Sequence, residues 1–258
     1  MPESHDEATE RSFTQQALGF EDARFNRVLT TESEWVFAAL PRTAEDVVLD
    51  VAAGTGQAAR SLAPEVRAVV AIDATEAMLA VGRAQADREG LSNIVFQRGD
   101  AARLPFLDAS FSIVVCRYAV HHFAEPDAQL AEMARCVRPG GRLALADLVS
   151  VADGEVAARQ NRLERLRDGS HVRALSTREL AAAIARHGLT VESVETREVR
   201  RPLESWLEQT QTPAAAAAEI ERALEDELAG GARTGFQPAR GDDGLTFVQR
   251  YTSIVATR

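Results

Sequence analysis

Two adjacent histidines and one carboxylate are the side chains of this 258-residue chain best suited to moving a proton. His121 and His122 follow a Val-rich run, and Asp147 lies near the end of a later apolar run. An imidazole titrates near neutral pH and can take a proton from a hydroxyl, while a carboxylate can orient the ring. The trio therefore predicts general-base catalysis. The alternative is that one histidine only packs beneath the sheet.

Three other carboxylates lie at the ends of successive apolar runs and indicate a binding site. These are Asp50, Asp73 and Asp100. In a doubly wound parallel sheet the carboxyl ends of the strands lie side by side along one crevice. Asp73 has the position of an acid that accepts hydrogen bonds from ribose hydroxyls, and Asp100 with the backbone N–H after it suits an adenine edge. Each could singly be a loop residue, but the ordered set predicts a nucleoside-containing ligand.

A glycine loop follows the first of these runs and is compatible with two kinds of ligand. Residues 54–59 fit the dinucleotide pattern G-x-G-x-x-G/A, which alone is weak evidence. Asp50 lies four residues before Gly54, where its charge would repel a pyrophosphate. S-adenosylmethionine carries an ammonium and a sulfonium and no phosphate, so the acid favours it over a nicotinamide dinucleotide. The alternative for Asp50 is that it only caps the loop.

The elements that would position these groups alternate between strand and helix, which predicts a parallel sheet with right-handed crossovers. A turn is expected at 139–141, and Ser176 and Glu179 form a capping box. The predicted strands are 47–51, 68–72, 93–98, 111–116, 142–148, 190–199 and 247–257. The predicted helices are 58–62, 75–90, 126–137, 152–172, 176–187 and one or two within 203–228.

The segments outside this alternation are candidates for the walls of an acceptor pocket. Residues 1–10 are expected to be disordered, and 12–40 to be helical, either as a lid over the ligand or packed against the sheet. The segment after the fifth strand and the insertion 203–235 would complete the walls. Apolar positions in the N-terminal part are Phe13, Ala17, Phe20, Phe25, Val28, Trp35, Phe37 and Leu40. The pocket residues that we expect are Phe13, Phe20, Leu175 and Trp206.

Composition excludes several classes of protein. The net charge is −10, so the surface as a whole should repel nucleic acid. The cysteines, Cys116 and Cys136, make no CxxC pair, and we expect neither a disulfide framework nor a metal. No secretory signal or apolar run of membrane-spanning length occurs in the sequence. We expect a cytoplasmic monomer or homodimer without nucleic-acid or membrane partners.

With these motifs the chain resembles the class I S-adenosylmethionine-dependent methyltransferases, and most closely their UbiE-like, small-molecule branch. Ser112 stands where the family often has Asp. Residues 117–120, Arg-Tyr-Ala-Val, replace the Asn-Pro-Pro-Tyr-like motif of enzymes that methylate amide or base nitrogens, which argues against such acceptors. The residues that carry the resemblance are 48–56, 72–73, 99–101, 104–106, 111–114 and 138–141.

The resemblance implies a Rossmann-like α/β fold with seven strands, of which the last is antiparallel. We expect one domain over 1–258, with lid helices in 1–40, a cofactor-binding core in 45–150, and cap segments with the last two strands in 151–258. The cofactor is expected to be S-adenosylmethionine, leaving S-adenosylhomocysteine as product. Its predicted contacts are Phe20, Asp50, Ala52, Gly54, Thr55, Gly56, Asp73, Ala74, Met78, Asp100, Ala101, Ala102, Cys116 and Arg117.

The acceptor is expected to be a small molecule. The sequence leaves open which of its atoms receives the methyl group. His121, His122 and Asp147 are similar to a trio in sugar O-methyltransferases of antibiotic pathways, which makes a hydroxyl oxygen the first expectation. Related carbon methylators also carry His-His-Phe, so an activated ring or enolate carbon is the second. An NAD(P)-dependent oxidoreductase is disfavoured by Asp50 and Asp100. A protein that retains the cofactor without transferring its methyl group is the remaining class.

Overall fold

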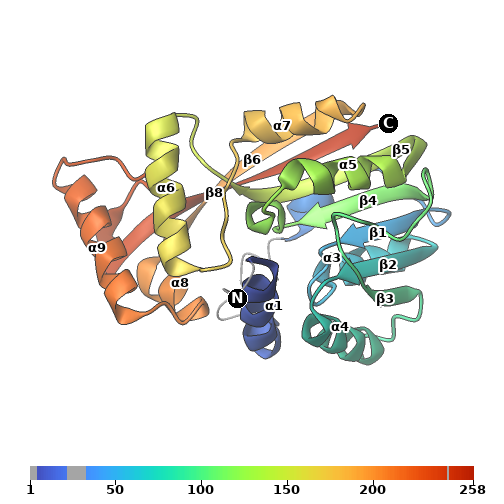
Figure 1. Ribbon diagram of the computed structural model, residues 1–258, viewed down its shortest axis with the longest axis horizontal. Helices are drawn as coiled ribbons and strands as arrows, with labels where there is room; N and C mark the ends of the chain where they lie inside the picture. Colours follow the sequence, from blue (N-terminus) through green and yellow to red (C-terminus); the bar gives the residue numbers. More distant parts are fainter. Residues whose placement is uncertain (1–4, 22–32, 243) are drawn as a thin grey trace.

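One mixed sheet forms the centre of the computed structural model, which describes residues 5–21, 33–242 and 244–258 (Figure 1). Its strand order is β3-β2-β1-β4-β5-β8-β6, with the short β7 paired to β8. β1 to β5 pair in parallel, and β8 is antiparallel to both β5 and β6. This confirms the predicted doubly wound α/β fold, with β7 as a short addition. The strands are β1 Val47–Val51, β2 Ala68–Asp73, β3 Ile94–Arg98, β4 Phe111–Arg117, β5 Val137–Val149, β6 Thr190–Pro202, β7 Ala239–Gly241 and β8 Gly244–Thr257.

Helices cover both faces of the sheet because successive side chains of a buried strand point to opposite faces. On one face Leu49 packs in a core with α5 and α7; on the other Val48 packs with α3 and η2. The helices of the described residues are α1 His5–Gln16, η1 Ala17–Gly19, η2 Ser33–Phe37, α3 Gln57–Leu62, η3 Ala63–Glu65, α4 Glu76–Arg88, η4 Val120–His122, α5 Pro126–Cys136, α6 Gly154–Arg167, α7 Thr177–Arg186, α8 Leu203–Gln209 and α9 Ala214–Leu228. No helix in these ranges is long and apolar enough to cross a membrane.

Local hydrogen bonds explain several of these boundaries. Ser176 and Glu179 form the predicted capping box at the start of α7. The Asp153 side chain accepts hydrogen bonds from two backbone N–H groups and so caps α6. Ser112, the departure from the family pattern, bridges β4 to β1, because its hydroxyl accepts from the Val47 N–H (2.9 Å) and donates to the Val47 C=O (3.1 Å).

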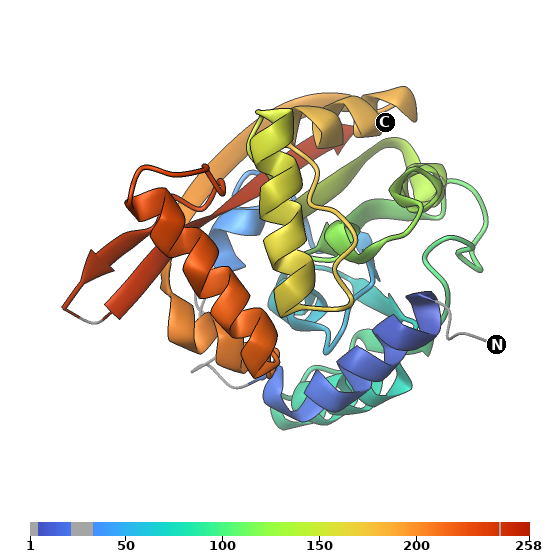
Figure 2. The same ribbon diagram turned by 60° about the vertical axis from the view of Figure 1, so that its left-hand side comes forward.

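A second, smaller core lies where β6 and β8 extend past the rest of the sheet. Trp206 of α8 is fully buried there between Phe236 and Phe247, with ring centroids 5.7 and 4.6 Å away. Leu163 of α6 and Leu224 of α9 close this core. Figure 2 shows α6 and α9 side by side at this end of the molecule, while α1 lies along α4 at the other side.

Two local predictions were wrong. Residues 1–10 were expected to be disordered, but α1 begins at His5, and the Glu10 carboxylate of this helix pairs with Arg98 at 2.8 Å. The turn expected before the fifth strand lies inside β5 as an irregularity, where Gly140 takes a positive φ of 73° and donates its N–H to the Arg258 C=O while the pairing with β4 shifts register between Val137 and Arg142. The predicted apolar positions Phe25 and Val28 lie outside the described residues.

Candidate active site

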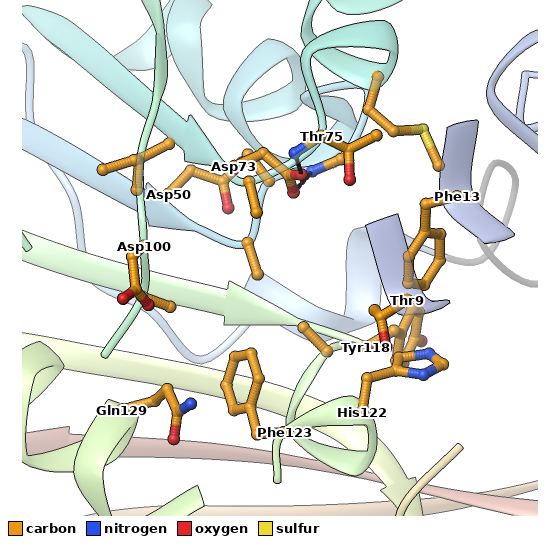
Figure 3. A pocket seen from close by; sticks show the side chains of 18 of the residues that line it. Thr9, Phe13, Asp50, Asp73, Thr75, Asp100, Tyr118, His122, Phe123 and Gln129 are labelled. Carbon is orange, nitrogen blue, oxygen red and sulfur yellow. Dashed lines mark hydrogen bonds between the residues drawn. The ribbon is translucent and has the colours of Figure 1, made fainter. Parts of the chain in front are cut away.

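A cavity of about 550 Å³ opens at the carboxyl ends of β1, β2 and β4. Figure 3 shows Asp50, Asp73 and Asp100 along one side of it, and Phe13, Tyr118 and His122 on the other. All but two of the residues predicted for the cofactor line this cavity. Those that do are Phe20, Asp50, Ala52, Gly54, Thr55, Asp73, Ala74, Met78, Asp100, Ala101, Ala102 and Arg117.

Gly56 and Cys116 are the two predicted residues that the structure does not bring to the cavity wall. A Cβ on Gly56 would lie 2.6 Å from the ring of Phe96, so this glycine allows the loop to pack on β3. Cys116 is fully buried in the core between its neighbouring strands, and burial raises the pKa of its thiol. A buried thiol of raised pKa stays protonated, which leaves it inert as a nucleophile.

Within the glycine loop, Gly54 is the glycine that lines the cavity. Its φ is +57°, and a Cβ there would meet no atom within 4 Å, so the space above it is open for a ligand. The loop is held from below, since the Gly54 N–H donates to Asp73 Oδ2 at 2.7 Å. Ala52 also has a positive φ, 53°, which is uncommon for a residue with a side chain. The hydrogen bond to Asp73 and these backbone angles together define the shape of the loop.

Asp50 is a nearly fully buried carboxyl at the floor of the cavity. Its Oδ2 accepts a hydrogen bond from the Ala59 N–H at 2.9 Å, and no described residue donates to Oδ1. Burial raises the pKa of Asp50 to about 7, although the Arg117 guanidinium works against the shift. A cationic ligand group placed beside this carboxyl would favour its charged form.

Asp73 and Asp100 each hold the backbone of their own loop as well as facing the cavity. Asp73 accepts from the N–H groups of Gly54 and Thr75, and burial raises its pKa. Asp100 Oδ1 accepts from the Ala102 N–H at 2.8 Å, and its side chain is 52% exposed. Each carboxylate oxygen has a second lone pair, so these bonds leave capacity for ligand hydroxyl or amine groups.

The N-terminal segment closes the cavity on its open side. Thr9 and Phe13 of α1 line it together with Phe20. Glu21 ties this segment to the glycine loop, because it accepts a hydrogen bond from Thr55 Oγ1 at 2.5 Å and pairs with Arg60 at 2.8 Å. The sequence did not indicate Glu21, since one acid among many carries no local signal.

His121 and Asp147 form a buried pair, as the trio predicted. His121 Nδ1 lies 2.5 Å from Asp147 Oδ1, and the His121 N–H donates to Asp147 Oδ2 at 3.1 Å. The Leu148 N–H also donates to Asp147, which keeps the carboxylate in place. Burial lowers the pKa of His121, but the charge and hydrogen bond of Asp147 outweigh it, so the pKa lies above its ordinary value. With Nδ1 facing the carboxylate, Nε2 is the nitrogen left for a substrate.

His122 has a different environment, although its ring centroid lies only 4.0 Å from that of His121. Its Nδ1 is 3.1 Å from both the C=O and the hydroxyl of Ser170, and that hydroxyl donates to Asp168. Nδ1 therefore carries the proton and donates to Ser170. Burial and the neighbouring His121 lower the pKa of His122, so the ring is neutral near pH 7.

A smaller pocket of about 90 Å³ adjoins the cavity and shares Phe13, Phe20, Tyr118 and His122 with it. His121 belongs to this pocket alone, whereas Asp147 lies behind it and lines neither. Of the four predicted acceptor residues, Phe13 and Phe20 line both spaces and Leu175 and Trp206 line neither. The remaining wall of the smaller pocket comprises Gln16, Leu148, Arg167, Asp168, Arg201, Gln209, Thr210, Gln249 and Tyr251.

Comparison with known proteins identifies the family. Residues 48–141 match the model of the methyltransferase domain. The chain is 37% identical over 171 residues to the uncharacterized methyltransferase YcgJ of Bacillus subtilis, spanning 66% of this chain and 68% of that protein. The crystal structure of YcgJ superposes with a TM-score of 0.80 at 32% identity, covering 87% of this chain and 96% of that one. The chain belongs to the class I S-adenosylmethionine-dependent methyltransferases, in their UbiE-like branch.

Two named relatives of this methyltransferase differ in how much of it they match. Demethylmenaquinone methyltransferase of Deinococcus radiodurans is 46% identical over 110 residues, which are 42% of this chain and 45% of the relative. The 27-O-demethylrifamycin SV methyltransferase of Amycolatopsis mediterranei is 30% identical over 185 residues, 68% of this chain and 65% of the relative. The methyltransferase thus spans less than half of the quinone relative and about two thirds of the rifamycin relative.

Proposed function

We propose that the methyltransferase binds S-adenosylmethionine in the 550 Å³ cavity and transfers its methyl group to a hydroxyl oxygen of a small molecule. The residues fit this cofactor. Gly54 leaves open space where a side chain would stand, and Asp50 presents a buried carboxyl oxygen to which no described residue donates. Asp73 and Asp100 supply acceptors for hydroxyl and amine groups at neighbouring strand ends.

The His121–Asp147 pair is the observation that favours oxygen as the acceptor atom. S-adenosylmethionine, when bound, supplies a methyl group on a sulfonium that needs no further activation. A hydroxyl must lose its proton as it attacks, and His121 Nε2 would take that proton while Asp147 stabilises the imidazolium. The shared wall of the two pockets would hold acceptor and cofactor side by side, so that orientation supplies much of the rate.

His122 is proposed to have a positioning role. It lines both pockets, but its lowered pKa makes it a weak base. Because its ring faces the wall shared by the two pockets, His122 would help to orient an acceptor hydroxyl beside the cofactor. The ring also packs edge-on against Phe13, with centroids 5.0 Å apart, which fixes its plane.

The named relatives include both kinds of acceptor atom, so oxygen is preferred here on the His121–Asp147 pair and not on the comparisons. The rifamycin relative, whose name describes a 27-O-demethyl substrate, matches over 68% of the chain. The quinone relative matches over only 42%. C-methylation of an activated carbon stays the second candidate because that shorter match is the more identical one. A carbon acceptor that is already an enolate or phenolate would need little help from His121.

The cofactor part of the proposal can be tested without knowing the acceptor. Calorimetry should detect binding of S-adenosylmethionine and S-adenosylhomocysteine and no binding of NAD or NADP. Native mass spectrometry of the purified protein should reveal either sulfur ligand if it co-purifies. Tight NADP binding with no response to S-adenosylhomocysteine would refute the assignment.

The base is tested by His121→Ala, with His187→Ala as control, because His187 is a half-buried histidine that pairs with Asp127 and lines neither pocket. Turnover of any acceptor found should fall about 10²- to 10⁴-fold in His121→Ala while cofactor affinity stays unchanged. In the wild type, turnover should rise with pH through the raised pKa of His121, above the ordinary value of about 6.5. Asp147→Asn should lower that pKa and the rate together. Near-wild-type turnover of His121→Ala with a flat pH profile would favour the carbon acceptor.

A further inference from the structure

Two arginines meet in the smaller pocket without a carboxylate in direct contact among the residues that the structure describes, although the charges of Glu164 and Asp168 act on Arg167 from nearby. Arg167, at the end of α6, and Arg201, near the end of β6, are half-buried and both line it. Their Nη2 groups donate to the same amide oxygen, Gln209 Oε1, at 2.8 and 3.2 Å. Two positive charges are therefore held at one neutral acceptor. The two like charges repel each other in this partly desolvated site, and the nearby Glu164 and Asp168 offset this repulsion without contacting the guanidiniums, so an anion placed between the arginines would add a direct partner.

The other hydrogen bonds of the two guanidiniums go to neutral groups. Arg167 Nε donates to the Trp206 C=O at 3.2 Å, and Arg201 Nη1 donates to Gln249 Oε1 at 2.8 Å. Among the residues that the structure describes, neither makes an ion pair with a carboxylate. Each has N–H groups beyond these bonds, since a guanidinium carries five. Arg201 also has a hydrogen-bond contact with the Tyr251 hydroxyl, which is a neutral group as well.

Packing holds the Arg167 guanidinium in one orientation. Its central carbon lies 5.0 Å from the centroid of the Trp206 ring, and Trp206 is itself fully buried in the smaller core. Stacking on an aromatic face and a bond to the backbone together fix the plane of the group. A planar guanidinium fixed in this way is suited to bind a carboxylate through two parallel hydrogen bonds.

Two acidic residues lie near this pair and bear on its preference. Glu164 is buried behind Gln249, whose amide donates to it at 3.0 Å, and it does not line the pocket. Asp168 does line it, and its Oδ1 accepts from the N–H and the hydroxyl of Ser170. Asp168 would oppose a doubly charged anion more than a singly charged one.

We infer that Arg167 and Arg201 form a subsite for a carboxylate of the methyl acceptor, so that the substrate is a hydroxy acid or a related acidic molecule. A volume of about 90 Å³ is smaller than the roughly 150 Å³ that holds a benzene ring, so the subsite takes one end of the acceptor. The rest would extend past His121 and His122 into the larger cavity. This inference rests on the proposed function, because it assigns the pocket beside the cofactor to the acceptor.

The test uses the whole protein saturated with S-adenosylhomocysteine and three matched probes. These are 4-hydroxybenzoate, 4-hydroxybenzamide and 4-hydroxyphenyl phosphate, with binding measured by ligand-observed NMR and calorimetry. The carboxylate should bind at least about tenfold more tightly than the neutral amide, and more tightly than the phosphate. Its affinity should fall as salt rises, because the contact is ionic.

Arg201→Gln is the informative variant, since Arg167 also contacts Trp206 and its loss could disturb folding. Arg200→Gln is the matched control, because Arg200 is the neighbour on β6, is exposed, and donates to the Gln237 C=O and Thr246. Arg201→Gln should remove the preference for the carboxylate and leave affinity for the amide and for S-adenosylhomocysteine unchanged. Arg201→Lys should recover only part of it, because a lysine cannot bind in a bidentate manner. Arg200→Gln should behave as the wild type.

The failures of the two proposals are distinguishable. If S-adenosylhomocysteine does not bind, the proposed function is wrong. If it binds and the carboxylate shows no advantage over the amide, including no detectable binding of either, the subsite is wrong and the cofactor assignment stands. Tighter binding of the phosphate, or an Arg201→Gln variant that keeps the carboxylate preference, would also overturn the inference.

Discussion

The two spaces that meet at His122 are built in opposite ways. The larger cavity, proposed to hold the cofactor, is lined by carboxyl groups at the ends of neighbouring parallel strands, and most of its wall comes from one continuous stretch of βα units. The smaller pocket is lined by arginines and amides drawn from α1, α6, α8, β6 and β8. The family model matches residues 48–141 and so includes the first but not most of the second. The residues of the larger cavity can therefore be retained across the family while those of the smaller pocket differ from one member to another.

The largest expected effect on ligand affinity comes from substituting a single glycine of the larger cavity, compared with a glycine elsewhere in the fold. Gly54→Val should abolish binding of S-adenosylhomocysteine, because the side chain would enter the open space above the loop. Gly188→Val is the matched control, since Gly188 also has a positive φ and nothing near its Cβ position but lies outside the cavity. Both should cost about 1–3 kcal/mol of stability through backbone strain. Calorimetry measures the affinity for S-adenosylhomocysteine, and thermal unfolding measures the loss of stability. Equal affinities in the two variants would contradict the placement of the ligand above Gly54.

A smaller effect is expected at Asp73, which would bind the ribose. Asp73→Ala should weaken S-adenosylhomocysteine binding by about 1–3 kcal/mol, roughly 5- to 150-fold, because ligand hydroxyls lose their acceptor and the Gly54 N–H loses its partner. The carboxylate probe should still prefer the arginine pocket when cofactor is saturating. Asp87→Ala, at an exposed position of α4, should change neither affinity. An unchanged affinity of Asp73→Ala for S-adenosylhomocysteine would mean that the Asp73 carboxylate holds the backbone of its loop and does not contact the ligand.

A change in pH should act on the cofactor cavity through Asp50. Its pKa of about 7 in the folded protein lies above the ordinary value of 3.8 for this carboxyl, so the group is mostly neutral below pH 7 and mostly charged above it. A cationic ligand prefers the charged form, so affinity should fall by up to about tenfold per unit as pH drops below 7. Calorimetry near pH 7 in buffers of different ionisation enthalpy should then detect proton release on binding. Asp50→Asn should remove that release, and an unchanged release would exclude Asp50 as its source.

The smallest effect tests whether the two spaces act together. Phe13 lines both and contacts His122, so Phe13→Ala should weaken cofactor and acceptor binding alike, by about 2- to 10-fold. Thr14→Ala, next to it and exposed on α1, is the control. If cofactor affinity and acceptor turnover are both unchanged in Phe13→Ala, α1 does not serve as a lid.

Sequence patterns were sufficient wherever neighbours along the chain also decide the structure. Val47–Val51 forms β1 with the predicted bounds, and the capping box at Ser176 begins α7, because both depend on residues a few positions apart. The contact of His121 with Asp147 was also predictable, since adjacent parallel strands bring their ends together. The roles of these side chains in catalysis stay predictions.

The arginine pocket was not predictable because it has no local signal. Arg167 and Arg201 look like ordinary surface arginines in helix and strand, and only the folded chain brings them to Gln209. Trp206 was expected in the pocket wall but is buried beneath Arg167, since its aromatic ring gains more from the core of Phe236 and Phe247. The packing of Phe96 against Gly56 was likewise hidden, because a glycine motif does not say which of its glycines faces the ligand.

The position of β8 between β5 and β6 has a consequence for how the chain folds. Thr257 pairs with both Arg142 and Thr190, so the edge that β6 needs exists only after a strand far along the chain has docked. Closing such long loops is slow compared with forming the local βα units. We expect an intermediate in which the glycine loop has its final shape while β5 still has an exposed edge. In that state the chain would already recognise its cofactor before any place for an acceptor exists, and a cofactor present during synthesis would act as a folding aid.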